Sequence, residues 1–126
     1  MDNIISLKNI DKIYGETVKT QVLFDVSLDF EKESFNSIIG QSGSGKSTLL
    51  NIVGTLDKPS GGDVVINGIS INDMNKKQLA NLRGKTLGFI FQFHYLLPEL
   101  TSIENVLLPA RNLGLDIAKY SEAESL

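Results

Sequence analysis

The first third of the chain alternates apolar and polar residues in the way that is typical of β-strands. Residues 4–10 alternate roughly with a period of two, and residues 22–30 alternate more strictly, so that each segment can turn one apolar face toward a core. The polar residues 15–21 between them predict a loop. A third segment, residues 35–39, is expected to be a strand that leads directly into a loop rich in glycine and serine, residues 40–45.

Beyond this loop the spacing of the apolar residues changes from that of a strand to that of a helix. Four apolar residues fall on one helical face: Leu49, Leu50, Val53 and Leu56. Pro59 and the glycines that follow it are expected to stop this helix. The pair Asn67-Gly68 predicts a type I′ turn, and therefore a β-hairpin over residues 63–71.

A short helix and one further strand are predicted after the hairpin. Asp73 is expected to cap the helix, which carries Leu79 and Leu82 and ends at Gly84. Residues 86–91 then have the apolar and β-favouring composition of a strand.

The last part of the chain is predicted to be helical. Thr101 and Glu104 have the spacing of a capping box, which predicts a helix that is kinked at Pro109. A new helix start is expected at residues 121–126. Because the chain ends inside that expected helix, the pattern favours part of a larger domain.

The overall composition is that of an ordinary globular protein. The 126 residues are 41% apolar and 21% charged, with a formal net charge of −3, so the chain as a whole has no attraction to nucleic acid or to anionic lipid. The absence of cysteine excludes disulfides, cysteine-ligated metals and a cysteine nucleophile. No apolar run approaches the ~18–20 residues of a transmembrane helix, and the N-terminus lacks the pattern of a signal peptide.

One motif indicates chemistry. Residues 40–47 read Gly-Gln-Ser-Gly-Ser-Gly-Lys-Ser and match the phosphate-binding pattern G-x-x-x-x-G-K-[ST]. Its glycines let successive backbone N–H groups point at phosphate oxygens, and the helix that follows directs its positive end to the same place. Lys46 can reach the terminal phosphates and the Ser47 hydroxyl can ligate Mg²⁺. The alternative, an accidental Gly/Ser turn, does not explain the expected strand before the motif and the helix after it.

Other nucleotide-binding families fit less well. A guanine-binding protein usually contains Asn-Lys-x-Asp, but residues 75–78 read Asn-Lys-Lys-Gln and lack the aspartate that accepts hydrogen bonds from guanine. A small-molecule kinase stays conceivable, although nothing in the sequence resembles an acceptor pocket.

Three features resemble the ATP-binding subunits of ABC transporters. Tyr14 resembles the aromatic residue that stacks on adenine, residues 40–50 resemble the family's Walker A loop, and Gln92 resembles its glutamine that reaches Mg²⁺. The resemblance implies an α/β fold with an incomplete P-loop NTPase (RecA-like) core and an N-terminal antiparallel β portion. It implies ATP and Mg²⁺ as cofactors, and it implies that Ser47 and Gln92 contact the metal. The residues implied to bind nucleotide are Tyr14, Gly40, Ser42, Gly43, Ser44, Gly45, Lys46, Ser47, Thr48 and Gln92.

Residues 91–101, followed by Glu104-Asn105-Val106, resemble one subgroup of this family. That subgroup drives lipoprotein release and macrolide or peptide export, and it includes the related cell-division ATPase. The resemblance implies a protein on the cytoplasmic, inner face of the cell membrane that couples ATP binding and hydrolysis to export or lipoprotein release. Membrane-spanning subunits are expected to bind through Gln92–Thr101, and a second ATP-binding subunit is expected to complete a dimer.

The family's hydrolytic motifs are missing from the sequence: the signature loop, the Walker B carboxylates and the switch histidine. Ser60-Gly61-Gly62 is interpreted as a turn and not as the signature, and His94 lies too near Gln92 to be the switch histidine. Residues 1–126 are therefore expected to be the N-terminal part of a single ABC-type ATP-binding domain. No catalytic residue is identified, so this chain alone is expected to bind Mg·ATP weakly without hydrolysing it, whereas the parent protein is an ATPase.

Two further alternatives remain open at this level. The chain could be a non-catalytic nucleotide-binding module with a regulatory role. An apolar cluster in an expected loop could be core packing or a docking patch for another protein; its members are Phe93, Tyr95, Leu96, Leu97 and Leu100. A small basic run is interpreted as a solvated helix face and not as a nucleic-acid site; it consists of Lys76, Lys77, Arg83 and Lys85.

Overall fold

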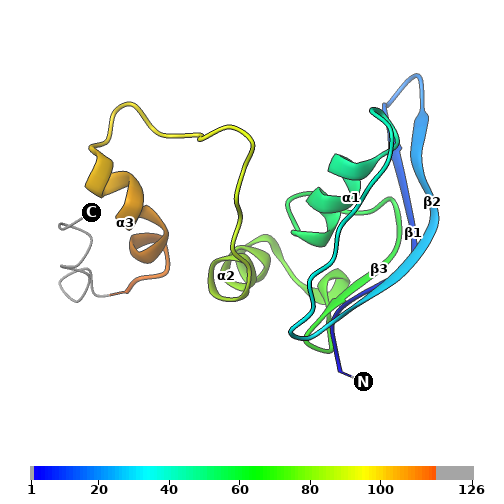
Figure 1. The fold of residues 1–126 in the computed structure, drawn as a ribbon, viewed down its shortest axis with the longest axis horizontal. Coiled ribbons are helices and arrows are strands. Elements are labelled where there is room, and N and C mark those ends of the chain that lie inside the picture. Colours follow the sequence, from blue (N-terminus) through cyan, green and yellow to red (C-terminus); the bar gives the residue numbers. More distant parts are fainter. Residues whose placement is uncertain (1, 116–126) are drawn as a thin grey trace. The chain divides into compact units, whose positions relative to one another are not determined.

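A computed structural model describes residues 2–115 of the chain, and Figure 1 shows it as a ribbon. The chain divides into two units, residues 1–79 and residues 80–126. The helix start predicted at residues 121–126 lies outside the described residues.

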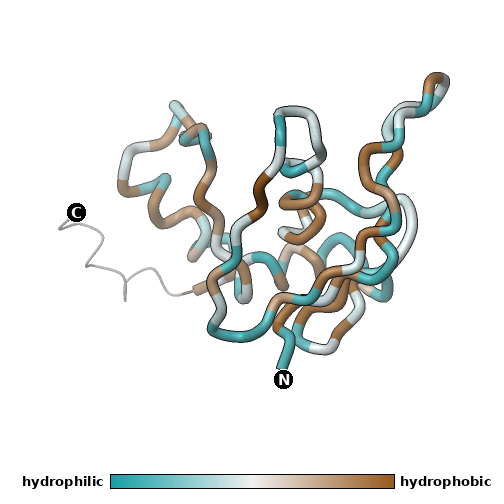
Figure 2. Tube along the Cα trace, turned by 45° about the vertical axis from the view of Figure 1, so that its right-hand side comes forward, coloured by the Kyte–Doolittle hydropathy of each residue, from teal (hydrophilic) through white to brown (hydrophobic). Residues whose placement is uncertain are grey.

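A four-stranded antiparallel sheet forms the body of the first unit (Figure 1). The order of its strands is β2-β1-β3-β4. Their bounds are Asn3–Tyr14 for β1, Thr20–Glu31 for β2, Gly61–Ile66 for β3 and Ile69–Ser70 for β4. The two strands predicted in the first third of the chain are confirmed, and both are longer than the alternating segments that indicated them. In Figure 2 hydrophobic and hydrophilic positions alternate along these strands, as a sheet with one covered face requires.

The predicted hairpin is confirmed. Asn67 and Gly68 have φ angles of 50° and 78°, which are the two left-handed positions of a type I′ turn. Val65 pairs with Ser70, and Ile66 pairs with Ile69.

Gly61 and Gly62 begin β3, so the turn predicted over residues 60–62 is wrong for both glycines. Ser60 instead contacts the end of β1, because its Oγ accepts a hydrogen bond of 2.9 Å from the backbone N–H of Ile13. Gly62 has a φ of +85°, and a Cβ on it would lie 2.3 Å from the backbone oxygen of Asn9. The sheet is irregular here, because the pairing register of β1 with β3 shifts after Lys8. A glycine is needed at position 62 for this close approach of two strands.

The core of the first unit lies between the sheet and α1 (Lys46–Val53). Its fully buried side chains come from β1, α1, β3 and the 3₁₀ helix η1 (Ile71–Asp73): Leu7, Ile10, Ile52, Val64, Ile66 and Ile71. The predicted apolar face of the helix is only partly right. Leu49 and Ile52 are buried, whereas Leu50 is 55% exposed and Leu56 lies beyond the end of the helix.

The prediction of a strand at residues 35–39 is wrong. This segment connects β2 to the loop before α1 without strand pairing, and Phe35 and Ile39 are 96% and 90% exposed (Figure 1). The strand predicted at residues 86–91 is also absent: α2 (Lys76–Thr86) takes its first residue, and the others are irregular. A strand is stable only when its N–H and C=O groups meet those of a neighbour, and neither segment has a neighbour among the described residues.

The cap predicted for the helix after the hairpin is at the wrong residue. Asn75 caps α2, because its Oδ1 accepts from the backbone N–H of Gln78 and the Gln78 side chain accepts in return from the N–H of Asn75, both at 2.9 Å. Asp73 closes η1 instead. The helix ends at Thr86, two residues beyond the predicted Gly84.

The second unit contains α3 (Ser102–Asn112), and its predicted capping box is confirmed. Thr101 Oγ1 accepts from the N–H of Glu104 at 3.2 Å, and Glu104 Oε2 accepts from the N–H of Thr101 at 2.8 Å. Pro109 lies inside this helix. Over residues 2–115, no helix combines the length and the apolar character needed to cross a membrane.

Candidate functional site

The Gly- and Ser-rich loop leads directly into α1, and two of its glycines adopt backbone conformations that determine the path of the loop. Gly43 and Gly45 have φ angles of 80° and 98°, which other residues adopt only with strain. Gly45 is also packed closely, because a Cβ there would lie 3.1 Å from Leu23 Cδ2. Gly45 stands at the N-cap of α1, and no side chain caps the helix. The first N–H groups of α1 therefore have no intrahelical acceptor and face the loop, where an anion can accept from them.

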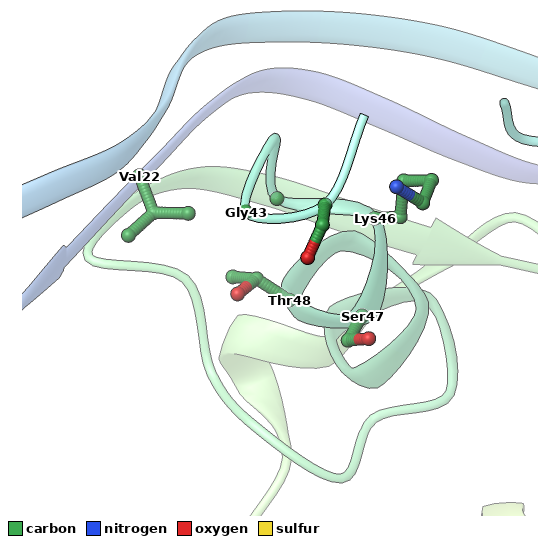
Figure 3. Close-up of a pocket in the computed structure, with 7 residues that line it drawn as sticks. Val22, Gly43, Lys46, Ser47 and Thr48 are labelled. Carbon is green, nitrogen blue, oxygen red and sulfur yellow. The ribbon is translucent and has the colours of Figure 1, made fainter. Parts of the chain in front are cut away.

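A pocket of about 530 Å³ lies at this junction. Its lining comes from β2, the loop and the first turn of α1: Val22, Ser42, Gly43, Gly45, Lys46, Ser47 and Thr48. Figure 3 shows Ser47 and Thr48 on α1 and Val22 on a strand beside the loop. Lys46 is the one charged residue among those that line it, and no carboxylate is among them. The pocket thus combines helix N–H groups, hydroxyls and an ammonium, a set that suits phosphate.

The backbone of the loop holds the side chain of Lys46 in place. Its Nζ donates hydrogen bonds of 2.6 Å to the carbonyl oxygens of Gly40 and Gln41. Ser44 Oγ lies 3.5 Å from the same atom. The ammonium is therefore already beside the pocket, where a phosphate oxygen would be a stronger acceptor than a neutral carbonyl.

The residues present suit a Mg²⁺ ion only if it is shared with a nucleotide. No group of three or more His, Cys, Asp or Glu side chains that could hold a metal occurs in the described part of the chain. Ser47, exposed on the first turn of α1, offers one hard oxygen at the pocket. Magnesium bound to phosphates typically takes few protein ligands and keeps several waters, so one hydroxyl fits that arrangement.

Tyr14 is brought to this site from the end of β1. Its hydroxyl lies 3.4 Å from Oγ1 of Thr48, which lines the pocket, and 3.3 Å from Oδ2 of Asp57. The residue is 40% exposed. The structure therefore joins two residues that are 34 positions apart in the sequence and that were both predicted to bind nucleotide.

Gln92 belongs to the second unit, where it is exposed in an irregular segment and not at the end of a strand as predicted. Its role beside Ser47 stays a prediction. His94, two residues later, is exposed.

The apolar cluster that follows Gln92 is largely exposed among the described residues. Phe93, Tyr95, Leu96 and Leu97 are exposed, and Leu100 is half-buried. The rings of Phe91 and Tyr95 contact edge to face at 5.2 Å between centroids. Leu96, Leu97 and Leu100 also line a groove of about 390 Å³ beside the start of α3.

Sequence reasoning missed three residues at the site. Val22 lines the pocket from β2, and Lys12 and Asp57 contact Tyr14. A signal existed only for Lys12, which stands two residues before Tyr14 and hence at the spacing of one strand face. Asp57 follows α1 and meets Tyr14 only through the fold.

Comparison with known proteins identifies the family of the chain. The ABC transporter family profile matches residues 23–126. The chain is 47% identical over 122 residues to the lipoprotein-releasing system ATP-binding protein LolD of Leptospira interrogans, covering 97% of this chain and 50% of that protein. It is 44% identical over 119 residues to LolD of Bacteroides thetaiotaomicron, covering 94% and 53%. The chain thus spans about half the length of the curated relatives it matches.

Among solved structures, the chain is similar to an ATP-binding cassette in a dimeric, post-hydrolysis state bound to ADP and Pi. The TM-score is 0.80 at 44% identity, over 86% of this chain and 47% of that one. A second similar structure is a dimeric bacterial ABC transporter cassette, with a TM-score of 0.81. The predicted α/β P-loop fold and the predicted resemblance are confirmed by these similarities, and the chain belongs to the ABC transporter family.

Proposed function

We propose that the protein is the ATP-binding subunit of an ABC transporter that couples ATP binding and hydrolysis to lipoprotein release. The observation that carries the proposal is the pocket over residues 40–48, in which Lys46 supplies the only charge among the lining residues. The LolD relatives, which are named for a lipoprotein-releasing system, support the substrate class.

In this proposal each part of the site has a separate task. The N–H groups of the loop and of the first turn of α1 surround the phosphates, and Lys46 exchanges its two carbonyl partners for phosphate oxygens. Thr48 stands between the phosphates and Tyr14, whose ring contacts the base. When bound, Mg²⁺ neutralises charge on the phosphates, and Ser47 and Gln92 are the residues proposed to reach it.

The Ser47→Ala substitution tests the metal assignment. We expect the affinity for ATP in the presence of Mg²⁺ to fall about tenfold, while the affinity for ATP in EDTA stays unchanged, because only the metal-ligating oxygen is lost. Isothermal titration of the full-length protein measures both values. Ser47→Thr keeps the hydroxyl and is the matched control. An equal loss with and without Mg²⁺ would contradict the assignment.

We propose that residues 1–126 alone bind ATP weakly and do not hydrolyse it. The support is that the residues lining the pocket include no carboxylate and no histidine, and phosphoryl transfer to water needs a group that orients the water. Phosphate release by this chain at saturating Mg·ATP is expected to equal the rate without protein, while the full-length protein turns over. Steady turnover by the 126-residue chain would show that the hydrolytic group is among these residues.

The partners are proposed from the second unit and from the similar structures. Phe93, Tyr95, Leu96 and Leu97 form an exposed apolar cluster, which would bind membrane-spanning subunits through the segment Gln92–Thr101. A second ATP-binding subunit would complete a dimer, as in the dimeric cassettes to which the chain is similar. With these partners, the protein would act at the cytoplasmic face of the cell membrane.

Reconstitution tests the proposed function as a whole. The full-length protein, combined with its membrane subunits in proteoliposomes, is expected to release an embedded lipoprotein to a soluble acceptor only when Mg·ATP is supplied. Release that is equally fast without ATP, or ATP turnover with no release of any lipoprotein, would contradict the proposed coupling.

A further inference from the structure

Lys12 is placed beneath the ring of Tyr14 and is held there by two oxygen partners. Its Nζ lies 5.0 Å from the centroid of the ring, within the range of a cation–π contact. The same atom forms an ion pair of 3.0 Å with Oδ2 of Asp57 and donates a hydrogen bond of 2.7 Å to the carbonyl oxygen of Lys58. Its side chain is only 12% exposed. This lysine is therefore a fixed part of the structure and not a mobile surface charge.

Asp57 is fixed in the same way. Its Oδ1 accepts a hydrogen bond of 2.9 Å from the backbone N–H of Lys58, and its Oδ2 contacts both Lys12 at 3.0 Å and the Tyr14 hydroxyl at 3.3 Å. Its backbone N–H donates to the carbonyl oxygen of Asn51 in α1. The carboxylate is thus anchored to the helix that begins at the phosphate-binding loop.

These contacts determine where the Tyr14 ring stands. One face of the ring is covered by the ammonium of Lys12, and its hydroxyl end is directed at Thr48 and Asp57. Yet 40% of the residue stays exposed. Thr48 lines the pocket, and its Oγ1 lies 3.4 Å from the Tyr14 hydroxyl, so Tyr14 lies next to the pocket. A nucleotide with its phosphates in the loop would have its base beside Tyr14.

We propose that Lys12 and Asp57 are positioning residues that hold the Tyr14 ring in the orientation in which it binds the base of the nucleotide. This role rests on the proposed ATP binding and adds residues to that site. Lys12 and Asp57 do not line the phosphate pocket, so they contribute to the binding of the base and not to the binding of the phosphates. Holding an aromatic ring before the ligand arrives lowers the ordering cost of binding.

The test compares two ligands that share phosphates but differ in the base. The affinity of the full-length protein for Mg·ATP and for Mg·tripolyphosphate is measured by isothermal titration. We expect Tyr14→Ala to lower the affinity for ATP about tenfold, because stacking of a base on an aromatic ring has about that value. Lys12→Met and Asp57→Asn are expected to lower it about fivefold. None of the three should change the affinity for tripolyphosphate.

Three further variants separate positioning from a general effect on the fold. Lys12→Arg keeps the charge and is expected to restore most of the ATP affinity. Lys12→Met in a Tyr14→Ala background is expected to cause no further loss, because the two residues act through one ring. Lys32→Met is the matched control, since it removes the lysine of an exposed ion pair with Asp2 and should change neither affinity.

Four results would overturn the inference and leave the proposed function intact. Lys12→Met could weaken both ligands equally, it could weaken ATP binding as much without the Tyr14 ring as with it, or it could leave ATP binding unchanged. If Lys12→Met fails to fold, Tyr14→Phe decides, because it removes the hydroxyl contacts and keeps the ring: an ATP affinity equal to that of the unmodified protein overturns the inference, and a loss confined to ATP supports it. Binding of neither ligand by the unmodified protein would instead overturn the proposed function, and this role with it.

Discussion

The Lys46→Ala substitution is expected to lower the affinity of the full-length protein for Mg·ATP about 100-fold and to abolish its ATP hydrolysis. Lys46 Nζ donates two short hydrogen bonds at the loop, to Gly40 and Gln41, and in the complex these would go to phosphate oxygens. Two hydrogen bonds to a charged group contribute about 3 kcal/mol, which corresponds to about 100-fold in affinity. Isothermal titration and phosphate release measure the two effects.

Lys76→Ala is a suitable control for Lys46→Ala. Lys76 is an exposed lysine at the start of α2 and does not line the pocket, so its loss should change neither affinity nor turnover. If Lys46→Ala leaves turnover unchanged, the loop is not the phosphate-binding site and the proposed function is wrong.

The Gly62→Ala substitution is expected to lower the free energy of unfolding by about 3 kcal/mol. Gly62 has a φ of +85°, and a Cβ would lie 2.3 Å from the backbone oxygen of Asn9 and 2.4 Å from that of Lys8. Both atoms belong to β1, which cannot move without disturbing the centre of the sheet. The strained φ and the forced displacement each cost roughly 1–3 kcal/mol.

Gly68→Ala is the matched control for Gly62→Ala. Gly68 has a φ of +78°, close to that of Gly62, but nothing lies within 4 Å of a Cβ placed there. The Gly68→Ala substitution should therefore lower the free energy of unfolding only by the cost of the strained φ, about 1 kcal/mol. Chemical denaturation of the full-length protein compares the two variants. Equal losses would show that the close approach of β3 to β1 does not contribute.

The sequence predicted those features that depend on residues close together in the chain. The antiparallel strands, the hairpin at Asn67-Gly68 and the capping box at Thr101 are set by local periodicity and local hydrogen bonds. The course of the glycine- and serine-rich loop before α1 was predictable for the same reason, since one short motif supplies its glycines and its lysine.

Features that depend on distant partners could not be predicted in the same way. Residues 35–39 have the apolar pattern of a strand, but such a pattern does not supply a neighbouring strand with which to pair. In the structure Phe35 and Ile39 of this segment are exposed. Lys12 and Asp57 are 45 positions apart, and only the packing of α1 against the sheet brings the loop after α1 to the end of β1. Such contacts between distant residues have no signature in a single sequence.

The central claim is that residues 40–48 bind the phosphates of ATP, and backbone amide chemical shifts measure this most directly. Titration of the isotope-labelled full-length protein with Mg·ATP is predicted to shift the amides of residues 42–48 most strongly, because their N–H groups acquire phosphate acceptors. ADP and tripolyphosphate should shift the same amides, whereas adenosine should not. Saturable ATP binding that leaves these amides unshifted would contradict the account.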